Sequence, residues 1–410
     1  MPNIVSVPID SIAAGGDGVG RSDGLVVFVP RSAPGDVVTA RISGKGRFAR
    51  GSLTTIVSPS ADRTDPPCDH YKRDRCGGCQ IQHITYHAQL AAKKQIIADA
   101  IQRIGKRDSS SLPDVEPSAK EWRYRTKLTM AIRREGSAWI AGLHRYDHPG
   151  QIFVLNDCPI TESDVVAAWR EVMSASRFFP TAKELRGSVR ITSAGATFVL
   201  YGGLQWPSSE DFLDAVPSVR ALWWEPEQGD RRLVEDRRDE KTPSASFGQV
   251  NPEVAAEMQR HLLERIRSYS PDSVVDAYAG LGDTSVELSR AGARVTAIEL
   301  DAEASEWASQ RLPAPSRALR GRVEELIGES LPADVVVINP PRAGIDAAVA
   351  EALEANVATT KAVMYVSCNP ATLARDLTRL PSYRIASLQP FDMFPQTAHV
   401  ETVCELVPAA

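Results

Sequence analysis

The sequence contains no long hydrophobic run and no recognisable targeting segment. Its longer apolar stretches, such as Leu25–Val29, are as long as a strand and far shorter than the roughly 18 residues of a membrane-spanning helix. The first residues, Met1–Ile4, lack the basic flank and apolar core of a secretory signal. Membrane-spanning, fibrous, collagen-like and disordered classes are therefore excluded, and we expect a cytoplasmic protein that makes no membrane contact.

The sequence also lacks an excess of positive charge. Its 410 residues include 47 Lys and Arg against 52 Asp and Glu, so the net charge is −5, which argues against an indiscriminate polyanion binder. A local basic face would still allow nucleic-acid binding. The length is typical of two to three domains, and no obligate protein partner is evident.

Cysteines are few and unevenly spaced. Three of the six lie close together, at Cys68, Cys76 and Cys79, and the others stand apart at Cys158, Cys368 and Cys404. In a chain without a secretion signal, such a cluster indicates metal ligation rather than a disulfide framework. For Cys404 we expect an ordinary buried thiol.

Residues 1–60 are predicted to form a small β-barrel. Short apolar runs at Val5–Ile9, Gly24–Val29 and Asp36–Ile42 are separated by turn-forming clusters, a spacing typical of a five-stranded barrel. Basic residues occupy the expected loops, with Phe48 among them, and they either follow an RNA backbone or form solvated turns. These residues are Arg21, Arg31, Lys45, Arg47 and Arg50.

Residues 61–240 are predicted to form a central mixed α/β region that contains the cysteine cluster. An amphipathic helix is expected over 88–104, ended by Gly105. The stretch Lys120–Lys127 interleaves four cations with two aromatic residues. That mixture suits phosphate pairing and base stacking, although a plain surface strand shows the same alternation.

Residues 241–410 alternate between strand and helix patterns, which predicts a doubly wound parallel sheet and places the whole chain in the α/β class. Two further strands, 384–388 and 400–406, are expected as an antiparallel addition. The expected parallel strands are Ser273–Ala277, Arg294–Ile298, Asp334–Ile338 and Ala362–Val366.

A glycine-containing turn follows the first of these strands. Gly280 and Gly282 allow the backbone to approach a ligand closely, while Asp276 anchors either a cationic group or the turn itself. About 20 residues later a strand ends in Glu299, where a carboxylate can accept both hydroxyls of a ribose. This arrangement is typical of S-adenosylmethionine sites, with a nicotinamide enzyme as the alternative.

Two other strands end in residues that can carry chemistry. Asn339 begins an Asn-Pro-Pro-Arg turn, and Cys368 lies between a serine and Asn-Pro. Ligands bind at the carboxyl ends of parallel strands, so both residues are expected beside the cofactor, with Cys368 as a nucleophile. Near the C-terminus, His399 and Glu401 share a face if the segment is extended, and Glu401 could serve as a general base.

Together these motifs resemble the bacterial RNA uridine-5-methyltransferase family over essentially the whole chain, and residues 1–60 look like a TRAM domain. The resemblance rests on the glycine turn and on motifs throughout the sequence. These are Cys76–Gln80, Trp122–Arg125, Asp157–Ile160, Ser246–Asn251, Asn339–Gly344, Ser367–Pro370 and Phe394–Glu401.

The resemblance implies a C-terminal Rossmann-like methyltransferase domain that transfers a methyl group from S-adenosylmethionine to C5 of a uridine in RNA, through a covalent adduct with C6. Cys368 would be the nucleophile and Glu401 the proton acceptor, whereas His399 has no assigned role. Gln249, Tyr278, Glu299 and Asn339 would contact the cofactor. Cys68, Cys76, Cys79 and Cys158 match the ligands of a [4Fe–4S] cluster found in members acting on ribosomal RNA, although four thiolates can also hold zinc.

The expected substrate is therefore 23S ribosomal RNA, with transfer RNA as the alternative. Within enzymes, an exocyclic-amine methyltransferase that uses Asn339-Pro340-Pro341 is the main competitor. A non-catalytic RNA-binding protein is the alternative from another class. Neither alternative needs a covalent adduct with Cys368.

Overall fold

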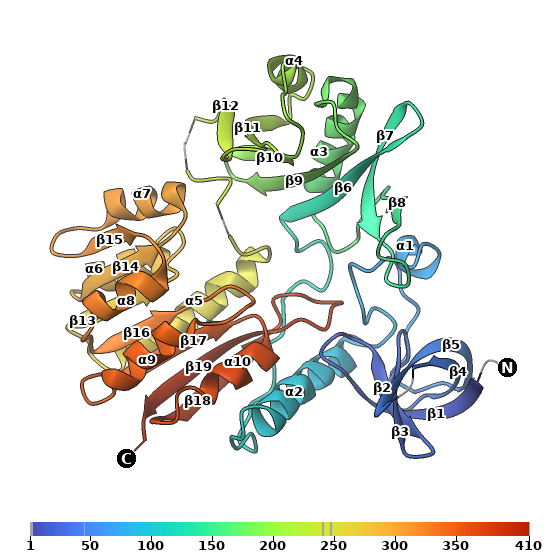
Figure 1. Ribbon diagram of the computed structural model, residues 1–410, viewed down its shortest axis with the longest axis horizontal. Coiled ribbons are helices and arrows are strands. Elements are labelled where there is room, and N and C mark those ends of the chain that lie inside the picture. The colour runs from blue at the N-terminus through green and yellow to red at the C-terminus, as the bar shows by residue number, and fades with distance from the viewer. Residues whose placement is uncertain (1–2, 45, 240–241, 247, 410) are drawn as a thin grey trace.

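The computed structural model describes residues 3–44, 46–239, 242–246 and 248–409, which build a closed barrel and two seven-stranded sheets (Figure 1). Lys45, Phe247 and the domain boundary expected at 240–241 lie outside the described residues. No helix within the described ranges is long and apolar enough to cross a membrane.

The N-terminal barrel closes in the strand order β1-β2-β3-β5-β4. Its interior is filled by small branched side chains, including Val7, Val27 and Val38, which are fully buried. The strands are β1 (Asn3–Ile12), β2 (Gly18–Ser22), β3 (Leu25–Val29), β4 (Val37–Ser43) and β5 (Phe48–Ser58).

The five-stranded barrel is confirmed, but part of the expected loop set is wrong. Arg21 lies in β2, while Phe48 and Arg50 lie in β5. Both strands pair with β3, so backbone hydrogen bonding holds these residues extended even though the local sequence is rich in turn formers.

Helix α2 (Tyr86–Arg103) connects the barrel to the C-terminal sheet, and it follows the short α1 (Asp69–Lys72). One part of its buried face, with Ala92 and Ile96, packs with Ile12 and Ala33 of the barrel. The following turns, with Ile97 and Ile101 among them, enter the core of the C-terminal sheet. The expected helix is thus confirmed, and it supports two parts of the molecule at once.

The central sheet has the order β12-β11-β10-β9-β6-β7-β8, and α3 and α4 lie on one face of it (Figure 1). Trp169, Phe198 and Phe212 fill the core between this face and the helices. Its elements are β6 (Lys127–Glu135), β7 (Ala138–His144), β8 (Ile152–Val154), α3 (Ser163–Ser174), η1 (Ser176–Phe178), β9 (Glu184–Thr192), β10 (Gly195–Tyr201), α4 (Ser209–Asp214), β11 (Val219–Glu225) and β12 (Arg232–Asp236).

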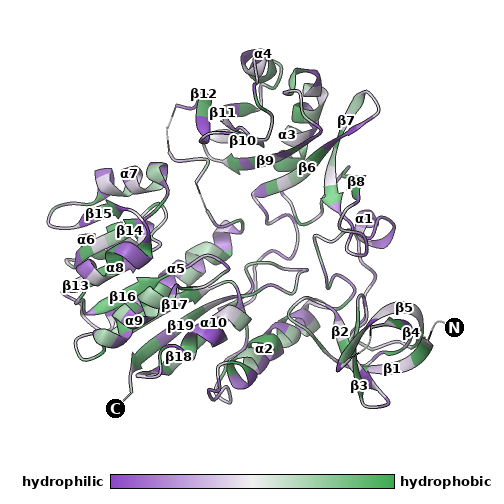
Figure 2. Cartoon of the chain, viewed as in Figure 1, coloured by the Kyte–Doolittle hydropathy of each residue, from purple (hydrophilic) through white to green (hydrophobic). Residues whose placement is uncertain are grey.

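The C-terminal sheet has the order β15-β14-β13-β16-β17-β19-β18, and its hydrophobic strands stand out in Figure 2. The first five strands are parallel, and β19 pairs antiparallel with both β17 and β18. Its elements are α5 (Pro252–Arg267), β13 (Ser273–Ala277), α6 (Asp283–Arg290), β14 (Arg294–Glu299), α7 (Ala302–Arg311), β15 (Arg317–Arg320), α8 (Val323–Ser330), β16 (Val335–Ile338), α9 (Ala347–Ala355), β17 (Ala362–Ser367), α10 (Pro370–Leu377), β18 (Tyr383–Phe391) and β19 (Glu401–Pro408).

Apolar side chains cover both faces of this sheet, as the predicted parallel sheet requires. In β13, Val274 packs into a cluster with α5, whereas Val275 and Ala277 pack into a second cluster with α8 and α9. The four expected parallel strands and the antiparallel addition are confirmed. The edge strand β15 was missed, because Arg317–Arg320 offers only two apolar residues between two arginines.

Candidate active site

The carboxyl ends of three neighbouring strands bring three of the predicted residues to one edge of the C-terminal sheet. Ala277 of β13 pairs with Ile298 of β14 on one side and with Ile338 of β16 on the other. Tyr278, Glu299 and Asn339 are each the next residue on its strand. The register therefore aligns them side by side where ligands bind in parallel sheets.

The turn after β13 depends on left-handed backbone conformations. Tyr278, Gly280 and Gly282 have φ angles of 61°, 56° and 77°. A Cβ on Gly282 would lie 2.7 Å from the Cβ of Ala308, so only glycine allows α6 to start there. Asp276 accepts a hydrogen bond of 2.5 Å from the Ser285 hydroxyl and is buried, so it anchors the turn.

Glu299 and Tyr278 line a cavity of about 290 Å³ at this edge, together with Leu300, Glu324 and Pro341. The Glu299 carboxylate accepts hydrogen bonds from the backbone N–H groups of Gly280, at 2.8 Å, and Asp301, at 2.7 Å. These contacts orient the carboxylate on the glycine turn. Of the four predicted cofactor contacts, the structure thus brings two into one cavity.

Gln249 and Asn339 are not among the residues that line this cavity. The Asn339 side chain is exposed, while its N–H donates to the carbonyl of Ala277 at 3.2 Å. Gln249 is half-buried and follows Gly248, whose carbonyl accepts a hydrogen bond of 2.7 Å from Arg190. The central sheet therefore holds the segment that carries Gln249.

Cys368 and Glu401 lie beside each other at the ends of two paired strands. Ser367 of β17 pairs with Thr402 of β19, and one residue further along this antiparallel pair are Cys368 and Glu401. Cys368 is half-buried, whereas Glu401 is almost completely buried. The structure thus brings together the two residues that the sequence predicted as nucleophile and proton acceptor.

Burial and proximity shift the acidity of both groups. Burial is the main cause that raises the pKa of Glu401, to about 8, and the cation of Arg342 opposes it. Burial also raises the pKa of the Cys368 thiol, and the Glu401 carboxylate raises it further. A pair of neighbouring acids with raised pKa values is typical of functional sites.

Arg342 is a site residue that the sequence prediction missed. Its positive charge and a hydrogen bond to the sulfur lower the pKa of Cys368, so the guanidinium stabilises the thiolate form. Burial lowers the pKa of His399 to about 4, and Arg342 adds to this effect, so the imidazole is neutral at neutral pH. The only sequence signal was the arginine that follows Asn-Pro-Pro, where a base-stacking aromatic is common.

The four predicted metal-ligating cysteines line a second cavity, of about 260 Å³. Cys68, Cys76, Cys79 and Cys158 are all buried and free of disulfides. Burial is the main cause that raises their pKa values, and the thiols of the group influence one another. Within the described residues, however, no three His, Cys, Asp or Glu side chains are arranged to hold a metal ion.

Arg342 and His399 line the cysteine cavity as well. Arg123 holds the segment of Cys158 in place: it binds both oxygens of Asp157, at 2.9 and 2.6 Å, and the carbonyl of Cys158 at 3.1 Å. Tyr124 is buried and donates to the carbonyl of Pro395 at 3.0 Å. Protein therefore encloses the ring of Tyr124, so within the stretch Lys120–Lys127 this aromatic residue is not available for base stacking.

The raised pKa of Glu401 predicts a pH-dependent stability. Glutamate in an unfolded chain has a pKa of about 4.3, so between about pH 4.3 and pH 8 the folded protein holds a proton that the unfolded chain releases. This stabilisation is complete below the lower value and is lost as pH rises towards 8. Relative to Glu401→Gln, the wild type should lose up to about 1.4 kcal/mol of unfolding free energy per pH unit in urea titrations. If the difference in unfolding free energy between wild type and Glu401→Gln stays constant across that pH range, the raised pKa of Glu401 is contradicted.

Comparisons with known proteins identify relatives along the whole chain. The sequence family described as tRNA (Uracil-5-)-methyltransferase matches residues 314–407. A protein of Thermosynechococcus vestitus named as an uncharacterized RNA methyltransferase is 31% identical, over 98% of this chain and 97% of its own length. A protein of Gloeobacter violaceus with the same kind of name is 34% identical, over 98% and 96%.

The fold is shared with a solved structure. The crystal structure of Pyrococcus abyssi tRNA (uracil-54, C5)-methyltransferase in complex with S-adenosyl-L-homocysteine superposes with a TM-score of 0.71, over 98% of this chain and 99% of that chain, at 21% identity. Asn339, Cys368 and Glu401 lie within the residues that match the tRNA (Uracil-5-)-methyltransferase family. Because the full-length relatives from Thermosynechococcus vestitus and Gloeobacter violaceus exceed 30% identity over nearly the whole of both chains, the chain belongs to the RNA methyltransferases.

Proposed function

We propose that this protein transfers the methyl group of S-adenosylmethionine to C5 of a uridine in RNA, with Cys368 as the nucleophile and Glu401 as the proton acceptor. The observation that carries the proposal is the β17–β19 register, which places a thiol and a buried carboxylate side by side. An exocyclic-amine methyltransferase needs neither group at this position.

S-Adenosylmethionine fits the cavity at the sheet edge. Glu299, held by two backbone N–H groups, presents a carboxylate that can accept the ribose hydroxyls, and Tyr278 lies beside it. The bound structural relative carries S-adenosyl-L-homocysteine on the same fold. Asn339 at the same edge and Gln249 on the adjoining segment complete the proposed contacts.

The residues suit the difficulty of the reaction. C5 of uracil is too weak a nucleophile to take a methyl group directly, so the Cys368 thiolate first forms a C–S bond with C6, and the ring becomes an enolate. When bound, S-adenosylmethionine supplies an electrophilic methyl group on a sulfonium sulfur, which keeps the electron pair of the broken bond. C5 then carries both a methyl group and a proton.

Glu401 completes the cycle by accepting the C5 proton, and the electron pair left on the ring expels the Cys368 thiolate. Arg342 stabilises the Cys368 thiolate both before it adds to C6 and after it is expelled, because the positive guanidinium lowers the pKa of this thiol. A carboxylate with a pKa of about 8 is also a stronger base than an exposed glutamate once it is ionised. A uridine in folded RNA must leave its stack to reach this site.

The four clustered cysteines are proposed to hold a [4Fe–4S] cluster rather than zinc. Four buried, disulfide-free thiols that line one cavity suit the thiolate ligation of this group. Since no step of the proposed reaction moves an electron, we assign the cluster a structural role. The cysteine set also favours 23S ribosomal RNA as substrate, with transfer RNA as the second candidate because the matching family is described by it.

RNA binding is proposed for the TRAM-like barrel and for the helix-free face of the central sheet. On that face Lys127 pairs with Arg190, and Ala131 and Tyr201 flank Arg186, whose guanidinium lies 4.1 Å from the ring centre of Tyr201. Burial is the main cause that lowers the pKa of Lys127 to about 8, and the positive charges of neighbouring arginines, Arg190 first among them, add to it. A basic, aromatic surface beside the active site suits a polynucleotide.

The proposed chemistry predicts opposite behaviour for two variants. Cys368→Ala should abolish methyl transfer from labelled S-adenosylmethionine and form no adduct with 5-fluorouridine RNA, while cofactor binding persists. Glu401→Gln should slow proton removal and accumulate, with unmodified RNA, an adduct that survives a denaturing gel. Cys404→Ala, which removes a buried thiol from β19, is the matched control. Full turnover by Cys368→Ala would favour the exocyclic-amine alternative.

The cluster proposal predicts iron and sulfide in protein purified without oxygen. We expect about four of each per chain, with visible absorption, and the loss of both in Cys158→Ala. Cys404→Ala should keep them. Zinc in place of iron would overturn the cluster assignment and leave the methyl-transfer chemistry unaffected.

The basic face predicts a salt-dependent contribution to RNA affinity. Lys127→Ala and Arg186→Ala should each weaken binding for all sequences and lower the slope of log affinity against log salt by about 1. Arg177→Ala is the control, because η1 lies with α3 and α4 on the other side of the sheet. If the salt-dependence slopes of Lys127→Ala and Arg186→Ala equal that of Arg177→Ala, the RNA does not bind to this face of the central sheet.

A further inference from the structure

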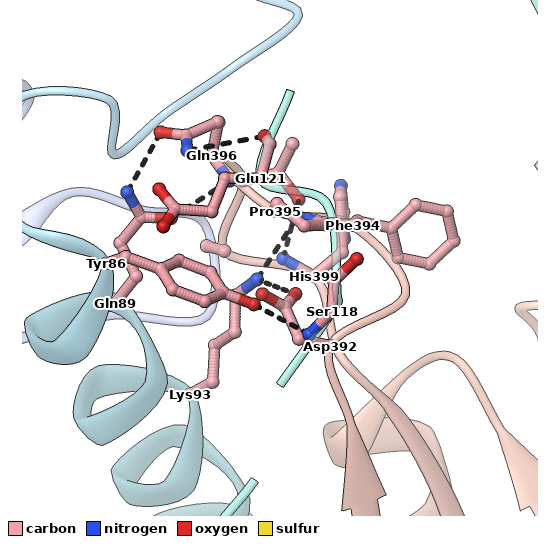
Figure 3. Close-up of polar contacts among 12 residues, drawn as sticks. Tyr86, Gln89, Lys93, Ser118, Glu121, Asp392, Phe394, Pro395, Gln396 and His399 are labelled. Carbon is pink, nitrogen blue, oxygen red and sulfur yellow. Dashed lines mark hydrogen bonds and ion pairs between the residues drawn. The ribbon is translucent and has the colours of Figure 1, made fainter. Parts of the chain in front are cut away.

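The loop between β18 and β19 carries His399 and leads directly into Glu401, yet much of its support comes from a distant helix. Figure 3 shows polar contacts that Gln89 and Lys93 of α2 make with this loop. Because these residues are four apart, they lie on the same face of α2, one turn from each other. The partners are 307 residues apart for Gln89 and Gln396 and 299 apart for Lys93 and Asp392, so the contacts exist only in the folded protein.

Gln396 is the centre of the first contact. Its φ of 70° is in the left-handed region, which is unfavourable for a residue with a side chain, and it is almost completely buried. Its N–H donates to Oε1 of Gln89 at 2.9 Å, and its Oε1 accepts from Nε2 of Gln89 at 2.9 Å. Its carbonyl accepts from the N–H of Ile81 at 3.2 Å. Such a backbone conformation persists only where the surroundings fix it from several sides.

Lys93 makes the second contact. Its ammonium forms an ion pair with Asp392, both side chains having no exposed surface, and donates to the carbonyl of Phe394 at 3.0 Å. A buried ion pair is a weak source of net stability, because the cost of removing two charges from water offsets their attraction. The contacts of Lys93 with Asp392 and with the carbonyl of Phe394 instead hold the loop in one conformation.

We propose that Gln89 and Lys93 are positioning residues for Glu401: from α2 they hold residues 392–400 in the conformation that places the proton acceptor beside Cys368. The inference rests on the proposed function. Cys368 itself follows β17, outside the loop, so disturbing these contacts should spare formation of the adduct and impair its resolution.

The first test replaces one amide in the full-length protein. Gln89→Met keeps the length of the side chain and removes both hydrogen bonds to Gln396, together with the bond of 3.1 Å that Gln89 donates to the carbonyl of Ile84 within the same segment. We expect turnover per folded molecule to fall about a hundredfold, the scale of a displacement of roughly 1 Å of a catalytic group. The denaturation-resistant adduct with unmodified RNA should accumulate, as with Glu401→Gln. The matched control is Gln95→Met, since Gln95 is exposed on the same helix and its side chain donates to Asp99 one turn away.

The second test separates positioning from stability. Lys93→Met/Asp392→Leu replaces the buried pair by apolar side chains, which should keep the unfolding midpoint near that of the wild type. Turnover should still be low and the adduct should still accumulate, whereas Lys94→Met, at a partly exposed neighbour, should behave as wild type.

The proposal would be overturned if Lys93→Met/Asp392→Leu turned over like the wild type and accumulated no adduct. It would also be overturned if adduct formation and turnover of Gln89→Met fell by the same factor. Failure of the proposed function is distinguishable from either result. In that case the wild-type protein itself forms no adduct with 5-fluorouridine RNA.

Discussion

The antiparallel pairing of β17 with β19 is the constraint on which the proposed site depends. The five parallel strands alone would place Cys368 at a sheet edge with no acid beside it. Strand β19 runs antiparallel to β17. Its first residue, Glu401, therefore lies next to Cys368, the residue that follows β17. Burial then sets the acidity of both groups: it raises the pKa of Glu401 to about 8 and that of the Cys368 thiol above its usual value, while the Arg342 cation opposes both shifts.

The rest of the molecule holds this edge in place and surrounds it. Helix α2 packs against the barrel at one end and against the C-terminal sheet further along, and its polar residues reach the loop before β19. The cysteine segment contacts the same loop, since Ile81 bonds to Gln396 and the side chain of Gln80 lies 3.4 Å from the N–H of Ala398. Barrel, cysteine segment and methyltransferase sheet therefore meet at the residues that precede Glu401.

Much of this could be predicted from the sequence where the signal is local. The edge of the sheet could be predicted because strand patterns end in a glycine turn, in Asn339 and in Cys368. The short apolar runs near the N-terminus predicted the β-barrel. Strands with weak patterns were missed: β15 offers two apolar residues, and β5 begins in a stretch of arginine and glycine. In both cases pairing with a neighbouring strand decided the structure.

Contacts between distant segments were beyond local reasoning. Arg342 was judged by its departure from a motif, whereas its effect on Cys368 depends on the fold. The stretch Lys120–Lys127 was compatible with base stacking or with a plain surface strand, but the ring of Tyr124 is buried and its hydroxyl donates to the carbonyl of Pro395. Nothing near Gln89 or Lys93 in the sequence indicated partners some three hundred residues away.

The most direct measurement of the central claim is the mass of the peptide that becomes attached to RNA. The full-length protein is incubated with S-adenosylmethionine and an RNA containing 5-fluorouridine, which has no C5 proton to release, and the denatured adduct is digested and sequenced by mass spectrometry. The account predicts a single modified peptide in which the nucleotide and its new methyl group are attached to Cys368. Attachment at another residue, or methylated RNA with no attached protein, would contradict it.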